Sequence, residues 1–291
     1  MKPMIKNLCL ALATALPGSA FALTVTTSND AAALATVLCG SGVTISNAVL
    51  TGTATQQGTF SGGASSIGIA SGVILTSGNA ALATGPNNAD GAGANLGTAG
   101  TSYLNALIPG YTSYDANVLA FDFTTNSGNL FFKYVFASEE YNEYVNSNFN
   151  DVFGFFFNGA NIALIPGTST PVSINNVNCG YSDGGSLPGT NPSNCNLFNN
   201  NDLQNGGALF DIQYDGFTDV FTASILGLQP NETYHIQLAI ADAGDHILDS
   251  AVFLQEGSFT DTNPDLPEPA SLALLGIGLA GLGALRRRKN V

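Results

Sequence analysis

Short runs of apolar and β-branched residues, separated by glycine and asparagine, dominate residues 40–260. In residues 130–137 the sequence Leu-Phe-Phe-Lys-Tyr-Val-Phe-Ala alternates between an aromatic-rich set and a set that contains Lys133, as expected for the two faces of a strand. Asn158-Gly159 separates two of the runs, and because both residues tolerate positive φ they favour a tight hairpin turn. The pattern predicts about eleven strands, at residues 43–50, 67–75, 117–123, 130–137, 152–157, 161–165, 172–176, 210–214, 220–225, 234–241 and 250–259.

Few helices are expected among these strands. Ser28-Asn29-Asp30 precedes an apolar run over residues 31–38, which predicts a capped helix, and residues 102–108 predict a shorter one. Many short strands without intervening helices favour an all-β fold, an antiparallel β-sandwich of jelly-roll or Greek-key type. Leu228-Gln229-Pro230 ahead of Tyr234 resembles a tyrosine corner, in which a tyrosine hydroxyl bonds to the preceding backbone.

Two stretches lack a strand pattern. Residues 78–100 are rich in Gly, Ala and Asn and predict a long surface loop, and residues 175–205 contain ten asparagines. Cys179 and Cys195 bracket the middle of the second stretch, and a disulfide between them would contribute about 3 kcal/mol by restricting the unfolded chain. The remaining mature cysteine, Cys39, is expected to be a buried small apolar residue.

The first residues have the order of a secretory signal. Lys2 and Lys6 precede an apolar run over residues 8–16, and Ala20-Phe21-Ala22 has the small residues of a cleavage site. The run is too short for a membrane helix, which needs about twenty apolar residues. We therefore expect residues 1–22 to be removed as a signal peptide.

The last residues have a three-part order. Pro-Glu-Pro is followed by an uncharged segment over residues 270–285 and then by a cluster of cations. As a helix this segment would be about 24 Å long, enough for a single transmembrane span if the arginines reach the headgroups. The cations would stay cytoplasmic and the body would lie outside the membrane, whereas a buried core helix would explain neither the terminal position nor the cations. The residues concerned are Pro267, Glu268, Pro269, Arg286, Arg287, Arg288 and Lys289.

The charge of the body limits its partners. The 291 residues include 21 acidic and 7 basic side chains, and between Leu23 and Pro267 the only Lys or Arg is Lys133. With 20 acidic residues and this one lysine, the region therefore has a net formal charge of −19. Such a surface repels phosphate backbones, which excludes ordinary nucleic-acid binding, and it attracts cations.

Acidic residues in two turn-rich passages suggest a calcium site. Three aspartates lie within eight residues at the end of a predicted strand, and a second acidic passage would meet them if the strands are neighbours. Calcium takes six to eight oxygen ligands, although the spacing is not that of an EF-hand. The alternative is that the aspartates cap turns and bond to neighbouring strands, and zinc is disfavoured because suitable nitrogen and sulfur ligands are scarce. The candidate metal ligands are Glu139, Glu140, Asp151, Asp242, Asp245 and Asp249.

The sequence offers little support for catalysis. His235 and His246 are the only histidines, and no Gly-x-Ser-x-Gly or His-Glu-x-x-His motif is present. Adjacent Glu139 and Glu140 would point to opposite faces of a strand, although two distant carboxylates could still form a glycosidase site. We therefore expect no enzyme activity, with a secreted polysaccharide hydrolase as the alternative. Tyrosines and asparagines in residues 141–146 suggest a glycan-binding loop, or side chains that stabilise the loop itself.

Two resemblances follow from these segments. The Pro-Glu-Pro, the apolar run and the arginine-rich end together resemble a PEP-CTERM sorting signal of Gram-negative bacteria, which implies processing by an exosortase-type membrane protease. The passages Phe-Ala-Ser-Glu-Glu-Tyr at 136–141, Asn-Asp-Val-Phe-Gly-Phe-Phe at 150–156, Tyr-Asp-Gly-Phe-Thr at 214–218 and Ala-Asp-Ala-Gly-Asp at 241–245 resemble the choice-of-anchor L domain. That family implies a surface module without an established activity.

The expected organisation is a signal peptide at 1–22, a sandwich domain at 23–259, a linker at 260–266 and a sorting segment at 267–291. The protein would be anchored transiently in the inner membrane through its C-terminal helix and then pass to the cell surface or to the exopolysaccharide matrix of a biofilm. There it would adhere to or organise matrix glycans, with calcium as the one expected cofactor; a structural coat protein without a ligand is a further alternative.

Overall fold

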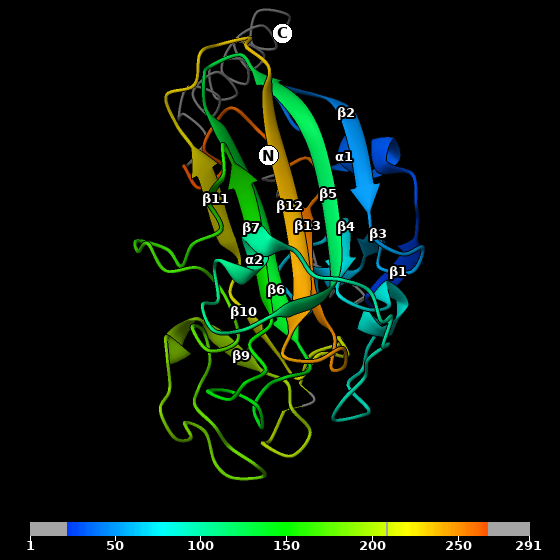
Figure 1. Cartoon of the computed structure of the whole chain (residues 1–291), viewed down its shortest axis with the longest axis vertical. Coiled ribbons are helices and arrows are strands. Elements are labelled where there is room, and N and C mark those ends of the chain that lie inside the picture. Colours follow the sequence, from blue (N-terminus) through cyan, green and yellow to red (C-terminus); the bar gives the residue numbers. More distant parts are fainter. Residues whose placement is uncertain (1–21, 208, 267–291) are drawn as a thin grey trace, which may run out of the picture.

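A computed structural model describes residues 22–207 and 209–266, which form two antiparallel sheets packed face to face (Figure 1). The larger sheet has the order β1-β3-β4-β13-β6-β10-β9, and β11 also pairs with β6. The smaller sheet has the order β2-β5-β12-β7-β8. The large-sheet strands are β1 (Thr24–Thr27), β3 (Gln57–Ser61), β4 (Ser71–Thr76), β6 (Leu130–Ser138), β9 (Phe198–Asn200), β10 (Gly216–Thr218), β11 (Phe221–Ile225) and β13 (Ser250–Gln255). The small-sheet strands are β2 (Val43–Thr51), β5 (Ser113–Thr125), β7 (Val152–Phe157), β8 (Ala160–Asn161) and β12 (Tyr234–Ala243).

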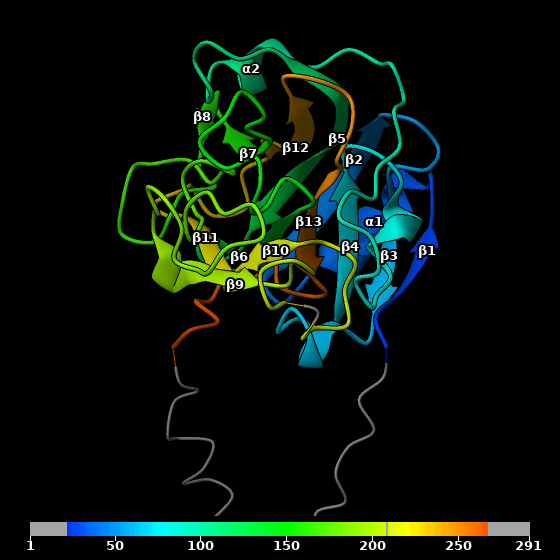
Figure 2. The same ribbon diagram turned by 90° about the horizontal axis from the view of Figure 1, so that it is seen from below.

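The main core lies between the sheets, and the view from below in Figure 2 shows the two layers. Alternation along β6 sends Phe132, Tyr134 and Phe136 into this core, where the Phe132 ring stacks on Phe259 at 4.2 Å between centroids. The other face of β6 is also covered, because Val135 belongs to a second apolar cluster on the outside of the large sheet. The expected aromatic-rich face of this strand is therefore the inner one.

The described residues also contain two short α-helices and three single-turn 3-10 helices, at Gly63–Ser65, Ala80–Ala83 and Cys195–Leu197. Helix α1 (Ala31–Leu38) begins where the carboxylate of Asp30 accepts a hydrogen bond from the Ala33 amide at 3.0 Å, as the capping pattern predicts. Helix α2 (Ser102–Asn105) begins at Thr101, whose hydroxyl accepts from the Leu104 amide at 3.2 Å. It covers part of the outer face of the small sheet.

The predicted antiparallel sandwich is confirmed, and the jelly-roll or Greek-key connectivity stays a prediction. Asn158 and Gly159 have φ of 50° and 79° and form the expected hairpin turn between β7 and β8. The expected strands at 172–176 and 210–214 are wrong, since both segments make only isolated bridges, although their apolar side chains Val172 and Ile212 are buried. Strands β1, β3, β9 and β10 were not predicted because their sequences are short and largely polar.

Side-chain contacts fix two connections. The hydroxyl of Tyr234 accepts a hydrogen bond from the Gln229 amide at 2.8 Å, the contact of a tyrosine corner. The expected linker lies against the body: the Thr260 amide donates to the Phe131 carbonyl at 3.0 Å, and Lys133 Nζ lies 2.8 Å from Asp265 Oδ1.

Both ends of the described chain leave from the large-sheet side (Figure 2). Within the described residues, no helix is both long and apolar enough to cross a membrane. The predicted signal peptide, the transmembrane helix and the Pro-Glu-Pro with its arginines lie, apart from Ala22, outside those residues.

Candidate functional site

The ends of several strands meet at the lower side of the molecule in Figure 1. Buried acidic residues lie in or directly next to these strand ends in the sequence. Antiparallel pairing of Ser138 with Ser250 places the end of β6 beside the start of β13. Pairing of Ala241 with Val152 aligns the end of β12 with the start of β7 in the other sheet. We call six of the fully buried carboxyl groups gathered here the acid end: Glu139, Glu140, Asp151, Asp215, Asp242 and Asp249. Two further buried aspartates border it, Asp115 near Asp242 and Asp249, and Asp202 near Asp215.

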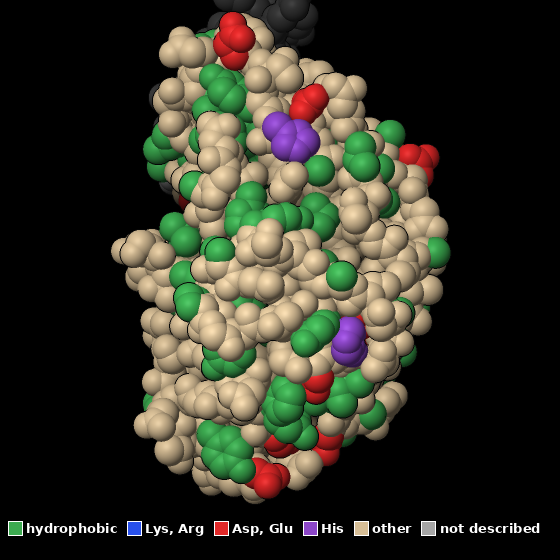
Figure 3. Space-filling model, viewed as in Figure 1, with side chains coloured by type: hydrophobic (Ala, Val, Ile, Leu, Met, Phe, Trp, Pro, Cys, Tyr) green, Lys and Arg blue, Asp and Glu red, His purple; other side chains and the backbone are tan. Residues whose placement is uncertain are grey.

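No lysine or arginine compensates for these charges. Each of the six side chains is at most 1% exposed. Lys133 is the only Lys or Arg in the part of the chain that the structure describes, and it pairs with Asp265 instead. Figure 3 likewise shows no lysine or arginine on the face it presents. The nearest cationic candidate is His246, whose Nδ1 lies 3.0 Å from Asp115 Oδ2 without the alignment of a hydrogen bond.

Two of the six carboxylates have clear structural roles. Asp151 accepts hydrogen bonds from the Ala243 amide at 2.8 Å and from the Ser250 hydroxyl at 2.7 Å, so it ties the two sheets together. Asp249 accepts from the amides of Asn79 and Ala94, both at 3.0 Å, and thereby holds the loop between β4 and β5. This agrees with the alternative in which aspartates bond to neighbouring segments.

Asp249 also explains a glycine in that loop. Its carboxylate lies where a side chain at Gly78 would have to be. Substitution of Gly78 by any larger residue would displace the carboxylate or the loop.

Three other carboxylates make no hydrogen bond of good geometry among the described residues: Glu139, Glu140 and Asp242. The Ala92 amide and Asp215 lie close enough to Glu139, and Ser77 close enough to Asp242, to affect the pKa values of these carboxyl groups as hydrogen-bonding neighbours, whereas Glu140 has no such neighbour. A fourth, Asp215, uses one oxygen to accept from the Asn87 amide at 2.6 Å and leaves Oδ2 unpartnered. Because an isolated buried carboxylate is strongly disfavoured, these groups must be neutralised, either by protons or by a cation.

Burial is the main cause of the raised pKa values. It raises the pKa of Glu139 to about 11, with the nearby Asp215 charge as the next cause. Burial and the charge of Asp151 raise the pKa of Glu140 to about 10. Burial also raises the pKa values of Asp151 and Asp215 to about 8, and it raises the pKa of Asp242 well above its ordinary value. Without a bound cation, the acid end therefore holds protons at neutral pH.

Asp245 differs from the other predicted ligands. It is only partly buried, and its Oδ1 accepts from the Ile247 amide at 3.2 Å, so it caps a turn at the margin of the acid end. Its charge still contributes to the raised pKa of Glu140. The structure thus gathers five of the six predicted ligands in the acid end and places the sixth beside it.

The carboxylates do not form a complete metal shell. Within residues 22–207 and 209–266, no group of three or more His, Cys, Asp or Glu side chains is arranged so that it could hold one metal ion. Calcium also accepts amide, carbonyl and water oxygens, which would have to complete its coordination here.

Sequence reasoning missed two members of this region. Asp215 directly precedes β10, and the pairing of Gly216 with Ser138 brings it close to Glu139. Tyr214 is buried, its hydroxyl has no hydrogen-bond partner among the described residues, and its pKa is raised by burial and then by Asp249. The only sequence signal for either residue was that both lie in the passage at 214–218 that resembles the choice-of-anchor L domain.

The loop suggested for glycan binding, residues 141–146, is half buried. The Tyr141 hydroxyl donates to the Val177 carbonyl at 2.7 Å, and Asn142 is fully buried against Asp202. Tyr144 is 37% exposed and packs edge-on against Phe149. These side chains stabilise the loop, as the alternative interpretation holds.

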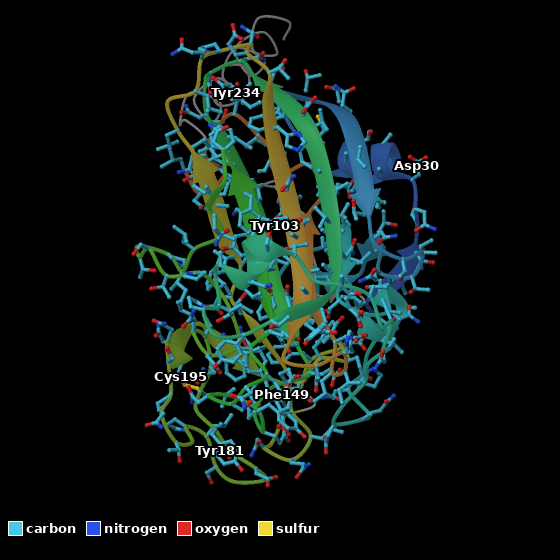
Figure 4. The ribbon with its side chains drawn as sticks, in the orientation of Figure 1. Asp30, Tyr103, Phe149, Tyr181, Cys195 and Tyr234 are labelled. Carbon is cyan, nitrogen blue, oxygen red and sulfur yellow. A yellow bond between two sulfur atoms is a disulfide. The ribbon has the colours of Figure 1, made fainter. Side chains whose placement is uncertain are left out.

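The asparagine-rich stretch surrounds the same end of the molecule (Figure 4). Cys179 and Cys195 form a disulfide with a Cα separation of 4.4 Å. Cys39 is partly buried, and its thiol donates to the Val43 carbonyl at 3.2 Å.

An antiparallel two-sheet sandwich with an acidic interior at one end defines a compact β module. The chain belongs to the choice-of-anchor L domain family, whose model matches residues 24–260. The PEP-CTERM protein-sorting motif matches residues 265–289, which implies export, processing by an exosortase and a place at the cell surface. No curated protein and no solved structure matches the chain.

Proposed function

We propose that this exosortase-processed surface protein is a non-enzymatic, adhesive or matrix-organising module whose acid end binds calcium. The observation that carries the calcium proposal is the set of fully buried carboxylates without hydrogen-bond partners and without a neighbouring lysine or arginine. A divalent cation replaces protons on such groups and removes the cost of their burial.

Calcium suits the chemistry better than other common metals. Every unpartnered group is a hard oxygen donor, and calcium tolerates irregular shells of six to eight oxygens. Magnesium demands near-octahedral geometry and dehydrates reluctantly, whereas zinc prefers nitrogen and sulfur. Glu140 and Asp242 are the first candidates for the ligands, because the charge of Asp151 raises the pKa of both and neither makes a hydrogen bond of good geometry.

Binding is a better interpretation of these carboxylates than catalysis. A glycosidase presents its acid and its nucleophile or base to a substrate, but Glu139 and Glu140 are at most 1% exposed. The buried groups support a structural cation more readily than a polysaccharide hydrolase. Turnover of a matrix polysaccharide by the purified protein would overturn this part of the proposal.

The test uses the exported protein purified in EGTA and then melted with and without 10 mM calcium. For a dissociation constant in the range of extracellular calcium modules, about 0.1 to 1 mM, this concentration stabilises the fold by about 1.4 to 2.7 kcal/mol. We expect a rise in Tm of several degrees and a much smaller rise with magnesium.

The variant for this test is the double change Glu140→Gln and Asp242→Asn, which should abolish the calcium-dependent rise. Glu232→Gln is the matched control, because Glu232 is exposed and lies outside the acid end. Asp249→Ala would be a poor choice, since it also releases the loop that Asp249 holds. No change in Tm at 10 mM calcium would remove the metal proposal.

A further inference from the structure

The outer face of the small sheet carries a pocket of about 330 Å³, away from the acid end. It is lined by Tyr103, Phe156, Asn158, Gly159, His235 and Gln237. Figure 4 shows Tyr103 on α2, in front of the strands of the small sheet. The volume lies in the range of small-molecule sites, about 300 to 1,000 Å³.

The register of the small sheet builds the floor of this pocket. Gln237 pairs directly with Phe156 across β12 and β7, and His235 lies two residues before Gln237, so the three side chains share one face. The residues on either side of Gln237, Ile236 and Leu238, point into the main core. Helix α2 covers the neighbouring part of the same outer face, and the pocket opens at its margin.

Two aromatic rings form one side of the pocket. Tyr103 and Phe156 meet edge to face, with ring centroids 4.8 Å apart and planes inclined at 71°. Partial burial raises the pKa of Tyr103, so its hydroxyl stays neutral. A ring that offers both apolar area and a polar edge suits a sugar, which has apolar C–H faces and a rim of hydroxyl groups.

Polar groups on the other sides are suited to those hydroxyls. His235 Nδ1 lies 2.8 Å from Asp122 Oδ1, and Asp122 also accepts from the Asn47 amide at 2.8 Å. This contact fixes the orientation of the imidazole and leaves Nε2 for a ligand. The side-chain amides of Asn158 and Gln237 can each donate and accept hydrogen bonds.

The charge of the protein limits the ligand further. No lysine or arginine lines the pocket, and the body has a net formal charge of −19. Uronic acids, sulfated sugars and phosphorylated groups would be repelled by such a body. From these observations we propose that the pocket binds a neutral sugar residue of an extracellular polysaccharide.

This inference deepens the proposed matrix role by naming a partner, and it does not depend on calcium. It also moves the expected glycan contact from residues 141–146 to the outer face of the small sheet. The pocket has no buried pair of carboxylates, so binding without cleavage is expected.

The test measures binding of the exported protein to neutral hexasaccharides of glucose, galactose, mannose and N-acetylglucosamine, by calorimetry and by saturation-transfer NMR. We expect binding of at least one of them and weaker binding of an oligogalacturonate probe. Tyr103→Ala should weaken binding about tenfold, the effect of losing about 1.4 kcal/mol of aromatic contact. Gln237→Ala should weaken it severalfold while leaving both rings in place.

Tyr181→Ala is the matched control, because Tyr181 is exposed in the disulfide loop far from α2. All variants are first compared by thermal melting, and Gln237→Ala keeps the test valid if Tyr103→Ala loosens α2. Three results would overturn the proposal. The protein binds none of the four neutral probes, or Gln237→Ala binds as tightly as the unaltered protein, or the protein prefers oligogalacturonate. If the protein binds sugar but calcium causes no rise in Tm, only the calcium proposal is refuted. If calcium raises the Tm but no sugar binds, only the sugar-binding proposal is refuted.

Discussion

Replacement of Glu140 by glutamine should stabilise the calcium-free protein at neutral pH, although it removes a buried residue's native side chain. Glu140 is fully buried, and neither of its oxygens has a hydrogen-bond partner among the described residues. Burial raises its pKa from 4.5 in the ordinary state to about 10 in the fold. Glutamine has nearly the same shape and cannot ionise.

The magnitude follows from this difference in pKa. Between 4.5 and 10 the unfolded chain ionises while the folded protein keeps its proton, so the stability of the fold decreases as pH rises. Between pH 4.5 and pH 7.5, about three pH units, this one group lowers the free energy of unfolding by about 4 kcal/mol, at roughly 1.36 kcal/mol per unit. Below the unfolded pKa both states are protonated and the effect vanishes.

Urea denaturation in EGTA, followed by circular dichroism, measures this difference. Glu140→Gln should be more stable than the unaltered protein by up to about 4 kcal/mol at pH 7.5 and nearly equal to it at pH 4.5. Addition of calcium should stabilise the unaltered protein and have little effect on the variant. If the variant is less stable in EGTA by the same amount at both pH values, Glu140 is not an uncompensated buried acid and the reasoning fails.

Further predictions extend these arguments. The pKa values of Asp151 and Asp215 are raised to about 8, so the unfolded chain loses these protons at a lower pH than the folded protein. In EGTA the unfolding free energy of the unaltered protein should therefore fall as pH rises from about 4 toward 8. An unfolding free energy that chemical denaturation finds constant over this pH range would contradict the prediction. Replacement of both Cys179 and Cys195 by serine should lower stability by about 3 kcal/mol and open their loop to limited proteolysis, whereas cleavage at the unaltered rate would show that the disulfide does not order it. Tyr234→Phe should cost about 1 kcal/mol in the same urea assay by removing the tyrosine-corner bond, and an unchanged midpoint would show that the bond adds nothing. Mass mapping of exported protein should find a C-terminus near the Pro-Glu-Pro motif; an intact tail on protein from the medium would contradict exosortase processing.

Local signals predicted the strands whose side chains alternate and the turns that need special dihedral angles. The hairpin at Asn158-Gly159 and the cap at Asp30 depend on only a few neighbouring residues, so both could be predicted. The segment at 172–176 has the composition of a strand, but its backbone makes only an isolated bridge through Ser173 to Val152. Its apolar side chains are buried all the same, which is why composition misled the prediction.

The acid end was predictable only in outline. Acidic residues in two turn-rich passages predicted that carboxylates meet if their strands are neighbours, and the excess of negative charge predicted that the body attracts cations. The sequence did not predict the role of each carboxylate. Asp151 and Asp249 accept hydrogen bonds from backbone amides, and Asp245 caps a turn. Glu140 and Asp242 make no hydrogen bond of good geometry. Hydrogen-bond partners come from distant segments, and one sequence does not show which segments those are.

The sequence by itself determined that the chain carries a C-terminal sorting motif, that its body is a sandwich of short antiparallel strands, and that it is strongly anionic. These properties follow from local composition, order and periodicity, which need no knowledge of distant contacts. Only the tertiary structure decided that six carboxyl groups are buried together and that Tyr103, His235 and Gln237 share a pocket. Both sites depend on how strands far apart in the chain pair, and the register of that pairing, rather than any local pattern, sets which side chains meet.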